Sequence, residues 1–562
     1  MVPSRLAVFI AALLVLSTSP SFAAAPDDAL ALIGTYAQQM MSSTHAPGLS
    51  VAVTDRAHTI KIFSLGLADV QSHTPVIETT RFGIGSISKS MTATALLLAR
   101  DRGVFDPSAP VTKYLPWFRV KSPYRPISGF DLLTHTSGLP DGGTGSSVYD
   151  VYALRNETVG YAPGEHWSYS NVGYETLGAI LQTVEGTQYS DTLAKRIFQP
   201  LGMVDSSGIW TPETLATAAT GYMYAYDDRP EPESYPLIAF PQTTFADPAG
   251  SVVSTAGDMA KYLRFILNAQ LLSPESYKLL TTASVKNGKT EAGLTGFYDH
   301  YAFGLAQQTV DGHHLVGHTG GVSRNTSCFQ ADLDSGFAVI AMSNLGYVGP
   351  RPCAVVAYAL KVLRAKSEGE PLPPVPAPAD PLHVDGASAY AGTYRSQDGE
   401  TLAFVAKNDH LRLENGAASE TMSERGGDQF WVDDPRFAQY TMRFIRDKDK
   451  HVTQMAHGSK VYSTAAYVGP TQFTHPKEWD AYEGTYRDAT SFAFGGEAHV
   501  LIVKDQLVLE DGTQLVPLGN GVFRVGTDDW SPERVTFSTI VNGVAQRAIF
   551  SAGPTLYRTF AQ

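Results

Sequence analysis

The sequence is poor in cysteine. Only two of its 562 residues are cysteines, Cys328 and Cys353, and no His-Glu-x-x-His or His-x-His pattern accompanies them. These residues do not fit a zinc site, so we expect no metal, and no other cofactor is indicated. In an oxidising compartment an even pair predicts one disulfide, and two buried thiols are the alternative.

Positive charge is also scarce. Lys and Arg number 42 against 55 Asp and Glu, the net charge is −13, and no basic run lies outside the N-terminus. Such a surface repels phosphates, which excludes nucleic acid as a partner. Long apolar runs are missing as well, because no segment after the N-terminus reaches about 18 unbroken apolar residues. We therefore expect no membrane span in the mature chain.

The N-terminus has the pattern of an export signal. Arg5 precedes an apolar run over 6–16, LAVFIAALLVL, and the small residues SFAAA follow. This pattern predicts a signal peptide over residues 1–25, cleaved near Ala23 or Ala25, and a membrane anchor is the alternative. Without a cysteine near the cleavage region, a lipoprotein is not expected. The protein is expected to be exported, either periplasmic or secreted.

One boundary divides the chain. Residues 367–382, SEGEPLPPVPAPADPL, have the composition of a semi-rigid extended linker. Before the linker, helix-like and strand-like patterns alternate, and after it short strands with Gly, Asn and Asp turns dominate. With 43 % hydrophobic residues, the chain can build several ordinary cores. The predicted domains are 26–366, 383–470 and 471–562.

The region after the linker contains an internal repeat. Three landmarks recur in the same order, in units of about 80–90 residues, the size of a small antiparallel barrel. The repeat predicts two homologous β domains. The landmarks are YAGTYR (390–395) and YEGTYR (482–487), HLRLENG (410–416) and QLVLEDG (506–512), and Phe430 with TMRF (441–444) against Phe523 with VTFS (535–538).

A lysine occupies an unusual position in the stretch FGIGSISKSMTATALLLARDRG (82–103). The nearly all-apolar or small run over 91–99 predicts a buried helix that Gly103 stops, and Lys89 lies in its first turn, three residues after Ser86. Burial lowers the pKa of a lysine, so Lys89 can serve as the base for a nucleophilic Ser86. The alternative is a helix-capping serine followed by a lysine that reaches solvent.

A tyrosine and an asparagine stand two apart just before a second predicted helix. Tyr169 and Asn171 lie in a loop flanked by Gly and Pro, ahead of an amphipathic pattern over 177–184. In an extended loop they project to the same side, where a phenol can relay protons and an amide can bind a substrate. A tyrosine packed on the surface and an asparagine cap are the alternative.

A third segment, over 313–346, is typical of consecutive strands and carries His318, Gly320 and Gly321. Glycines within a strand often mark the close approach of another backbone, and an edge strand of small residues can dock a substrate. The N–H groups of Gly321 and Ser86 could form an oxyanion hole. A bulge with a surface histidine is the alternative.

In this order, Ser-x-x-Lys, Tyr-x-Asn and His-Thr-Gly resemble the motifs of the serine β-lactamase and penicillin-binding-protein superfamily. The resemblance is closest to its class C-like branch, which includes D-aminopeptidases, DD-carboxypeptidases and family VIII esterases. It covers roughly residues 27–365. It continues through DLLTHTSGLPD (131–141), RIFQPLGM (196–203) and PAGSVVSTAGDMAKY (248–262).

The resemblance implies an α+β fold in which an all-α domain packs against an antiparallel sheet flanked by helices, with the site between them. Two small antiparallel β-barrels follow, similar to the lipocalin-like domains of bacterial D-aminopeptidases. The implied roles are Ser86 as acylated nucleophile, Lys89 as its base, Tyr169 in proton exchange, Asn171 as ligand of a substrate amide, and Gly321 as second oxyanion donor.

The sequence departs from many β-lactamases at His318, where they have a lysine. A lysine is a permanent cation suited to a substrate carboxylate, whereas a histidine is mostly neutral near pH 7. Efficient penicillin hydrolysis is therefore less expected than peptidase action on small or D-residue-containing peptides. A carboxylesterase or weak β-lactamase is the alternative, and a non-turnover acyl-accepting sensor is another. The expected partner is a small peptide, amide or ester substrate.

The resemblance to D-aminopeptidases also suggests that a loop of a barrel reaches the cleft. The sequence leaves two hairpin tips as candidates, Glu414–Gly416 and Glu510–Gly512.

Overall fold

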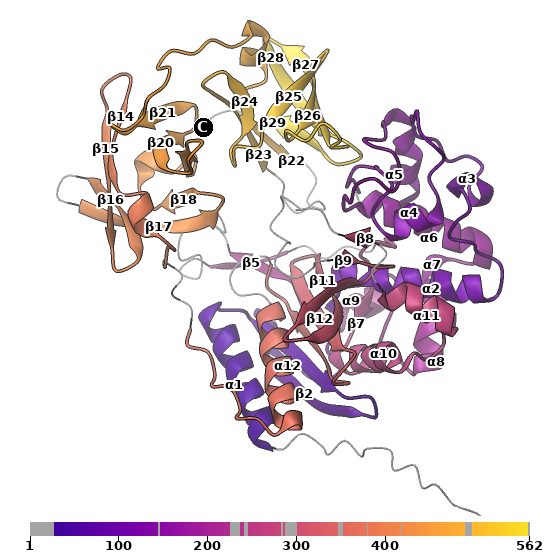
Figure 1. Ribbon diagram of the computed structural model, residues 1–562. Helices are drawn as coiled ribbons and strands as arrows, with labels where there is room; N and C mark the ends of the chain where they lie inside the picture. Colours follow the sequence, from indigo (N-terminus) through magenta and orange to yellow (C-terminus); the bar gives the residue numbers. More distant parts are fainter. Residues whose placement is uncertain are drawn as a thin grey trace, which may run out of the picture.

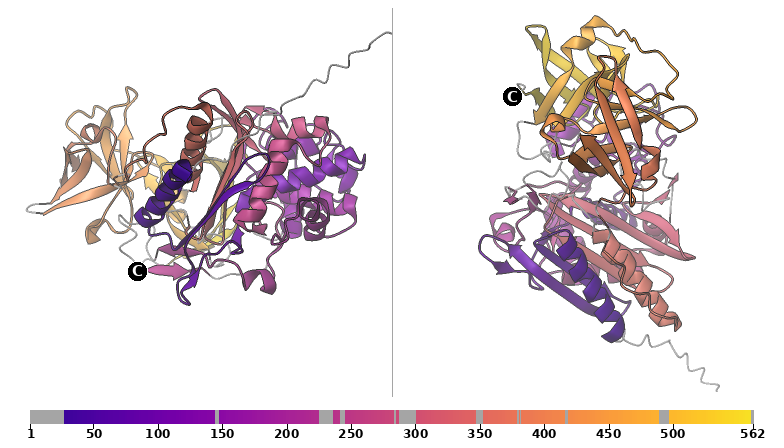
Figure 2. Two further views of the ribbon diagram at one scale, coloured as in Figure 1. Left: turned by 90° about the horizontal axis from the view of Figure 1, so that it is seen from below. Right: turned by 90° about the vertical axis from the view of Figure 1, so that its left-hand side faces the viewer.

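The computed structural model of the chain places two barrels at one end of the molecule, away from α1 and α12 (Figures 1 and 2). The predicted signal peptide lies outside the described residues. Among the residues that the structure describes, no helix is both long enough and apolar enough to cross a membrane. The described residues are 27–143, 147–224, 236–240, 245–282, 285–286, 300–346, 352–378, 380, 382–415, 418–488 and 497–559.

The α-helices are α1 (Asp27–Ser43), α2 (Ser88–Asp101), α3 (Val111–Tyr114), α4 (Gly129–Leu133), α5 (Ser147–Ala153), α6 (Asn171–Glu185), α7 (Tyr189–Leu193), α8 (Gln199–Leu201), α9 (Pro212–Leu215), α10 (Ala256–Asn268), α11 (Pro274–Thr281) and α12 (Pro352–Glu368). The strands before the barrels are β1 (Gly48–Thr54), β2 (Thr59–Asp69), β3 (Thr74–Pro75), β4 (Phe82–Gly83), β5 (Tyr222–Tyr224), β6 (Leu237–Ala239), β7 (Val253–Ser254), β8 (Val285–Lys286), β9 (His300–Tyr301), β10 (Ala306–Val310), β11 (His313–Val322), β12 (Asn325–Asp332) and β13 (Ala338–Ser343).

A nine-stranded sheet in the order β3-β2-β1-β13-β12-β11-β10-β9-β8 forms the middle layer of the first part of the chain. Its strands β1 and β13 are buried on both faces. Side chains alternate along β1, so Val51 and Val53 belong to the core under α1 and α12, and Ala52 belongs to the core under α2 and α10. This arrangement confirms the predicted antiparallel sheet flanked by helices (Figure 1).

The core under α2 and α10 continues into the helices α3 to α7. These helices form an all-α lobe beside the sheet (Figure 1). Helix α6 begins after Ser170, whose Oγ accepts the N–H of Gly173 at 3.0 Å, and it ends at Gly186 with φ 67°. Helix α2 lies between this lobe and the sheet, so the residues at its N-terminus face both. The predicted α+β class is therefore confirmed.

The region after the linker folds into two eight-stranded units. The first is a closed barrel of β14 (Gly392–Ser396), β15 (Thr401–Lys407), β16 (His410–Asn415), β17 (Ala418–Gly426), β18 (Gln429–Val432), β19 (Met442–Arg446), β20 (Val452–His457) and β21 (Lys460–Ser463). The second is a barrel-like sheet of β22 (Gly484–Asp488), β23 (Glu497–Val503), β24 (Gln506–Leu509), β25 (Leu515–Gly519), β26 (Val522–Val525), β27 (Arg534–Val541), β28 (Val544–Phe550) and β29 (Thr555–Arg558).

The repeated landmarks occupy equivalent places in the two units. Tyr394 and Tyr486 lie in the first strand of each unit and are fully buried in its core. Each hydroxyl donates to the main-chain oxygen four residues earlier, Tyr394 to Tyr390 at 2.9 Å and Tyr486 to Tyr482 at 2.8 Å. The two barrels therefore confirm the predicted fold of the tail, while the exact domain boundaries stay a prediction.

The two barrels pack on one another, which removes one candidate for a loop at the cleft. Glu510, in the predicted tip Glu510–Gly512, accepts the N–H of Thr441 from the first barrel at 2.6 Å. That tip therefore belongs to the contact between the barrels, and its prediction as a loop at the cleft is wrong. The other tip lies partly outside the described residues, since Gly416 is not among them.

The predicted linker is an extended segment held along two helices. Helix α12 continues to Glu368, two residues into the predicted linker. Beyond it, Pro373 O accepts the hydroxyl of Tyr358 at 3.1 Å, and Pro376 O accepts Nε2 of Gln39 at 2.7 Å. The segment therefore connects the sheet domain to the barrels along a fixed path.

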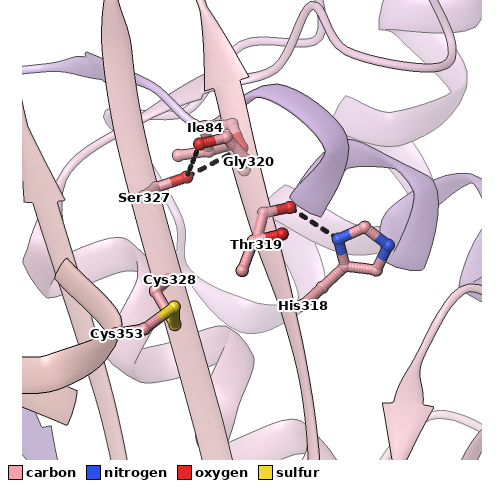
Figure 3. Close-up of a disulfide and its surroundings, with 7 residues drawn as sticks. All are labelled: Ile84, His318, Thr319, Gly320, Ser327, Cys328 and Cys353. Carbon is pink, nitrogen blue, oxygen red and sulfur yellow. Dashed lines mark hydrogen bonds between the residues drawn. A yellow bond between two sulfur atoms is a disulfide. The ribbon is translucent and has the colours of Figure 1, made fainter. Parts of the chain in front are cut away.

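Cys328 and Cys353 form a disulfide, which confirms the first of the two alternatives (Figure 3). The bond joins β12 to the first turn of α12, and both cysteines are buried. It thereby ties the helix layer to the middle of the sheet.

Removing this disulfide is expected to destabilise the protein. The two cysteines are 25 residues apart in sequence, so the disulfide restricts a loop of that length in the unfolded chain. The double variant Cys328→Ala/Cys353→Ala removes this restriction and is expected to lower the free energy of unfolding by about 3 kcal/mol. Denaturant unfolding measures this difference, and wild-type protein treated with reductant serves as the control because it should lose a similar amount. Free thiols in protein purified from an oxidising compartment would contradict the expectation.

Candidate active site

Ser86 and Lys89 meet at the start of α2. A 3₁₀ turn over Gly85–Ile87 precedes the helix, Ser86 is half-buried, and Lys89 is 0 % exposed. Lys89 Nζ lies 3.0 Å from Ser86 Oγ. Ser88 points elsewhere, since its Oγ accepts the N–H of Val252 at 3.0 Å. The predicted pair is thus in contact.

Three oxygens surround the Lys89 amine. Besides Ser86 Oγ they are Asn171 Oδ1 at 2.6 Å and the main-chain oxygen of Ala249 at 2.9 Å. The ammonium form satisfies all three with its three N–H groups. The neutral amine keeps only two N–H groups, and the two carbonyl oxygens can only accept. Its lone pair can therefore point only to Ser86, because the serine hydroxyl alone among these partners has a hydrogen to give.

Charge and burial oppose each other at Lys89. Burial lowers the pKa of Lys89 to about 8, and the negative charges of Asp247, Asp141 and Glu175 limit the shift. A lysine with this pKa is partly neutral near pH 8, as a base for a serine requires. Burial in turn raises the pKa of Asp247 and of Glu175.

Tyr169 lies beside the same amine. Lys89 Nζ is 4.8 Å from the centre of its ring, and the ring of His135 packs on it at 4.3 Å. His135 also holds the loop, because its Nδ1 accepts the N–H of Ser170 at 3.0 Å and its main-chain oxygen accepts the N–H of Ser168 at 2.8 Å. The structure thus places Tyr169 beside Lys89, whose amine contacts Ser86, and the role of Tyr169 in proton exchange stays a prediction.

Asn171 is the first residue of α6, and both ends of its amide are engaged. Its Oδ1 accepts from Lys89, and its Nδ2 donates to Asp141 Oδ1 at 2.8 Å. The asparagine therefore lies at the predicted place, where it holds the lysine. Its predicted contact with a substrate amide stays a prediction.

The strand β11 lies directly against the turn that carries Ser86. A Cβ on Gly320 would fall 1.9 Å from Ile84 O, and a Cβ on Gly85 would fall 2.3 Å from Gly321 N. Ser327 Oγ donates to Ile84 O at 3.0 Å from the neighbouring strand (Figure 3). The close backbone approach predicted from the glycines is confirmed, and only glycine fits at these positions. The oxyanion role of Gly321 stays a prediction.

His318 is neutral and its ring is occupied. It is 3 % exposed, and burial lowers its pKa to about 3. Nδ1 lies 2.6 Å from the main-chain oxygen of Thr319 and must donate to it (Figure 3). Nε2 therefore accepts from the hydroxyl of Tyr301 at 3.0 Å. The ring thus offers no cation to a carboxylate, and its predicted substrate contact stays a prediction.

The sequence did not single out several residues of this cluster. Asp141 and Ala249 lie within segments 131–141 and 248–262, whose resemblance to the superfamily was the available signal. His135 lies in the first of these as well. Glu533, which accepts the N–H of Asp141 at 2.8 Å, comes from the second barrel and carried no signal.

One group of side chains away from this cluster has the spacing of metal ligands. His313, Asp332 and Asp334 offer atoms within 4.8 Å of one another, at the end of β11 opposite Gly321. Arg364 Nη1 lies 3.6 Å from Asp332, so a guanidinium already faces the carboxylate and opposes a second cation there. We assign no metal to this group.

Comparison with known proteins places the cluster in a family context. The family model described as Beta-lactamase matches residues 33–363. Penicillin-binding protein 4* of Bacillus subtilis (strain 168) is 27 % identical over 380 residues, which are 62 % of this chain and 80 % of that protein.

Two solved structures share the fold. The octameric penicillin-binding protein homologue from Pyrococcus abyssi has a TM-score of 0.57 at 22 % identity and covers 77 % of this chain and 99 % of its own. The D-amino acid amidase from Ochrobactrum anthropi SV3, complexed with L-phenylalanine amide, has a TM-score of 0.51 at 25 % identity and covers 60 % and 99 %.

Proposed function

The chain belongs to the Beta-lactamase family of serine hydrolases, and from this premise we propose that it is an exported hydrolase that cleaves small peptides through an acyl-enzyme on Ser86. D-residue-containing peptides are included in the proposed substrate class. The contact that supports this most directly is Lys89 Nζ at 3.0 Å from Ser86 Oγ, in a lysine whose pKa is about 8.

The proposed reaction has two halves. Ser86 Oγ attacks the substrate carbonyl and gives its proton to Lys89, while the N–H groups of Ser86 and Gly321 bind the developing oxyanion. The bond to the amine then breaks, and the leaving nitrogen takes a proton relayed through Lys89 and Tyr169. Water hydrolyses the ester on Ser86 by the reverse transfers, which regenerates the serine and releases the acid.

The charges around Ser86 support a substrate that is neutral or carries an ammonium group near the acyl carbon. Asp141, Asp247 and Glu175 all act on Lys89 electrostatically, and His318 is neutral. A substrate carboxylate would be repelled by these acids. In a site with a lysine in place of His318, the lysine would attract it instead. The similarity to a D-amino acid amidase agrees with a substrate that has a free amine.

A substrate panel tests this proposal. D-alanine p-nitroanilide, with its free amine, is expected to exceed N-succinyl-D-alanine p-nitroanilide by at least about tenfold in kcat/KM, or 1.4 kcal/mol. The L-enantiomer, D-Ala-D-Ala peptides, nitrocefin and p-nitrophenyl acetate complete the panel. Preference for the succinylated compound would contradict the charge argument.

Other outcomes of the panel identify the other candidates. A carboxylesterase, the second candidate, hydrolyses only p-nitrophenyl acetate; the neutral His318 favours it over a β-lactamase. One equivalent of p-nitrophenol without turnover indicates an acyl-accepting sensor.

Export is proposed from the N-terminal sequence alone. Arg5, the apolar run over 6–16 and the small residues up to Ala25 support it. N-terminal sequencing of the protein from the culture medium or periplasm should find it beginning after Ala23 or Ala25.

A further inference from the structure

Asp141 fixes which end of the Asn171 amide faces the lysine. Asp141 Oδ1 accepts both the side-chain Nδ2 of Asn171 at 2.8 Å and its main-chain N–H at 3.1 Å. A carboxylate accepts only, so the NH2 end must face Asp141 and the oxygen must face Lys89. If the amide turned round, its NH2 group would face the lysine. It could then donate a hydrogen bond to the lone pair of the neutral amine, which otherwise points to Ser86.

Asp141 itself is exposed to solvent, and its place depends on its main chain. Its main-chain oxygen accepts the N–H of Val172 from α6 at 3.0 Å. Its N–H donates to Glu533 Oε1 at 2.8 Å. One of these two anchors belongs to the all-α lobe and the other to the second barrel, in the loop between β26 and β27.

The contact at Glu533 is part of a docked surface. Trp530, three residues before it, stacks on His166 with ring centres 4.4 Å apart and 6° between the planes. On the other side, Gly143 N–H donates to Ala552 O at 2.8 Å. The second barrel is thus held on the all-α lobe by two loops: the loop between β26 and β27, which presents Glu533, and the loop between β28 and β29, which contains Ala552.

The surroundings of Glu533 disfavour its charged form, which is not expected of a carboxylate whose only role is to dock the barrel. Burial and the charge of Asp141 raise its pKa to about 7, although the Asp141 N–H favours the charged form. Placing two like-charged carboxyl groups together costs stability, and such pairs are concentrated at functional sites. A hydroxyl or amide acceptor would have served docking without that repulsion.

We propose that Glu533 of the second barrel is a positioning residue for the acyl transfer: it holds Asp141, Asp141 orients the Asn171 amide, and that amide directs the lone pair of Lys89 to Ser86. The barrel thereby completes the catalytic centre although it contributes no group to the reacting atoms. This inference rests on the proposed acyl-enzyme function.

The test compares acylation rates in the full-length protein, followed by the burst with p-nitrophenyl acetate and by fluorophosphonate labelling. Glu533→Ala is expected to acylate about tenfold more slowly with KM changed less than about twofold. Glu533→Gln keeps an oxygen acceptor and should recover most of the rate. Glu478→Ala, the same substitution at an exposed position just before β22, is the matched control and should stay within about twofold of wild type.

Asp141→Ala keeps the proposal testable if Glu533→Ala does not fold, because it leaves the barrel unchanged. It is expected to lose at least as much acylation rate as Glu533→Ala. The double variant should lose no more than Asp141→Ala alone, since both residues act through one chain of contacts. Normal acylation in either single variant, or an equal loss in Glu478→Ala, overturns the proposal.

A crystal structure of Glu533→Ala separates this inference from the function on which it rests. Absence of fluorophosphonate labelling in the wild type refutes the acyl-enzyme function only. If Asn171 in the variant keeps its bonds to both Asp141 and Lys89, the positioning role is refuted whatever the activity. A turned or displaced amide supports the positioning role.

Discussion

Ser86→Ala is expected to abolish turnover and labelling by a fluorophosphonate while the protein stays folded. Of the three oxygens that the described residues place around Lys89 Nζ, only Ser86 Oγ carries a hydrogen, so its removal leaves the neutral lysine with none of these groups to deprotonate. The expected fall in kcat/KM is at least about a hundredfold. The fold should tolerate the change, because Ser86 is half-buried and Lys89 keeps two oxygen partners.

The control for this variant is Ser42→Ala, on the exposed face of α1. It should match wild type in activity and in labelling. More than about a hundredth of wild-type activity in purified Ser86→Ala would show that another group is acylated or that no acyl-enzyme forms. Mass spectrometry of the labelled wild type locates the adduct directly.

The central pair could be predicted from sequence because its geometry is local. Three residues on a helical turn suffice to bring Lys89 to Ser86, and the apolar run that follows predicts the burial that lowers the lysine pKa. The barrels were predictable for a similar reason, since Tyr394 and Tyr486 occur in a repeated hexapeptide and take equivalent places.

The contacts that hold Asp141 in place could not be predicted, because they join segments far apart in the sequence. Glu533 and Asp141 are separated by 392 positions, and neither the repeat nor any local pattern indicates which barrel loop reaches the lobe. The predicted tip at Glu510 was wrong because a turn-forming sequence shows where a hairpin ends and not what the hairpin packs on. The hydrogen bond between His318 and Tyr301 could not be predicted either. The two residues come together because β10 pairs with both β9 and β11, and the sequence does not show the register of these pairs.

Lys89→Arg is expected to be nearly as damaging as loss of the serine. An arginine keeps its charge at any working pH, so it can bind the oxygens around Lys89 but cannot accept a proton from Ser86. The acylation rate should therefore fall by at least about a hundredfold. Lys113→Arg, on α3 at the surface, is the matched control and should acylate as wild type does.

The wild-type pH profile tests the same requirement from the other side. Because the base is the neutral amine and the pKa of Lys89 is about 8, acylation should be slow at low pH, rise through about pH 8 and level off above it. The sign follows from the direction of the shift: burial lowers the pKa from its ordinary value, so the active form appears at a lower pH than for an exposed lysine. Near-normal acylation by Lys89→Arg would contradict this mechanism, since a guanidinium can supply charge but not basicity; Lys89 would then be a structural cation that binds Asn171 and Ala249, and the deprotonation of Ser86 would fall to Tyr169.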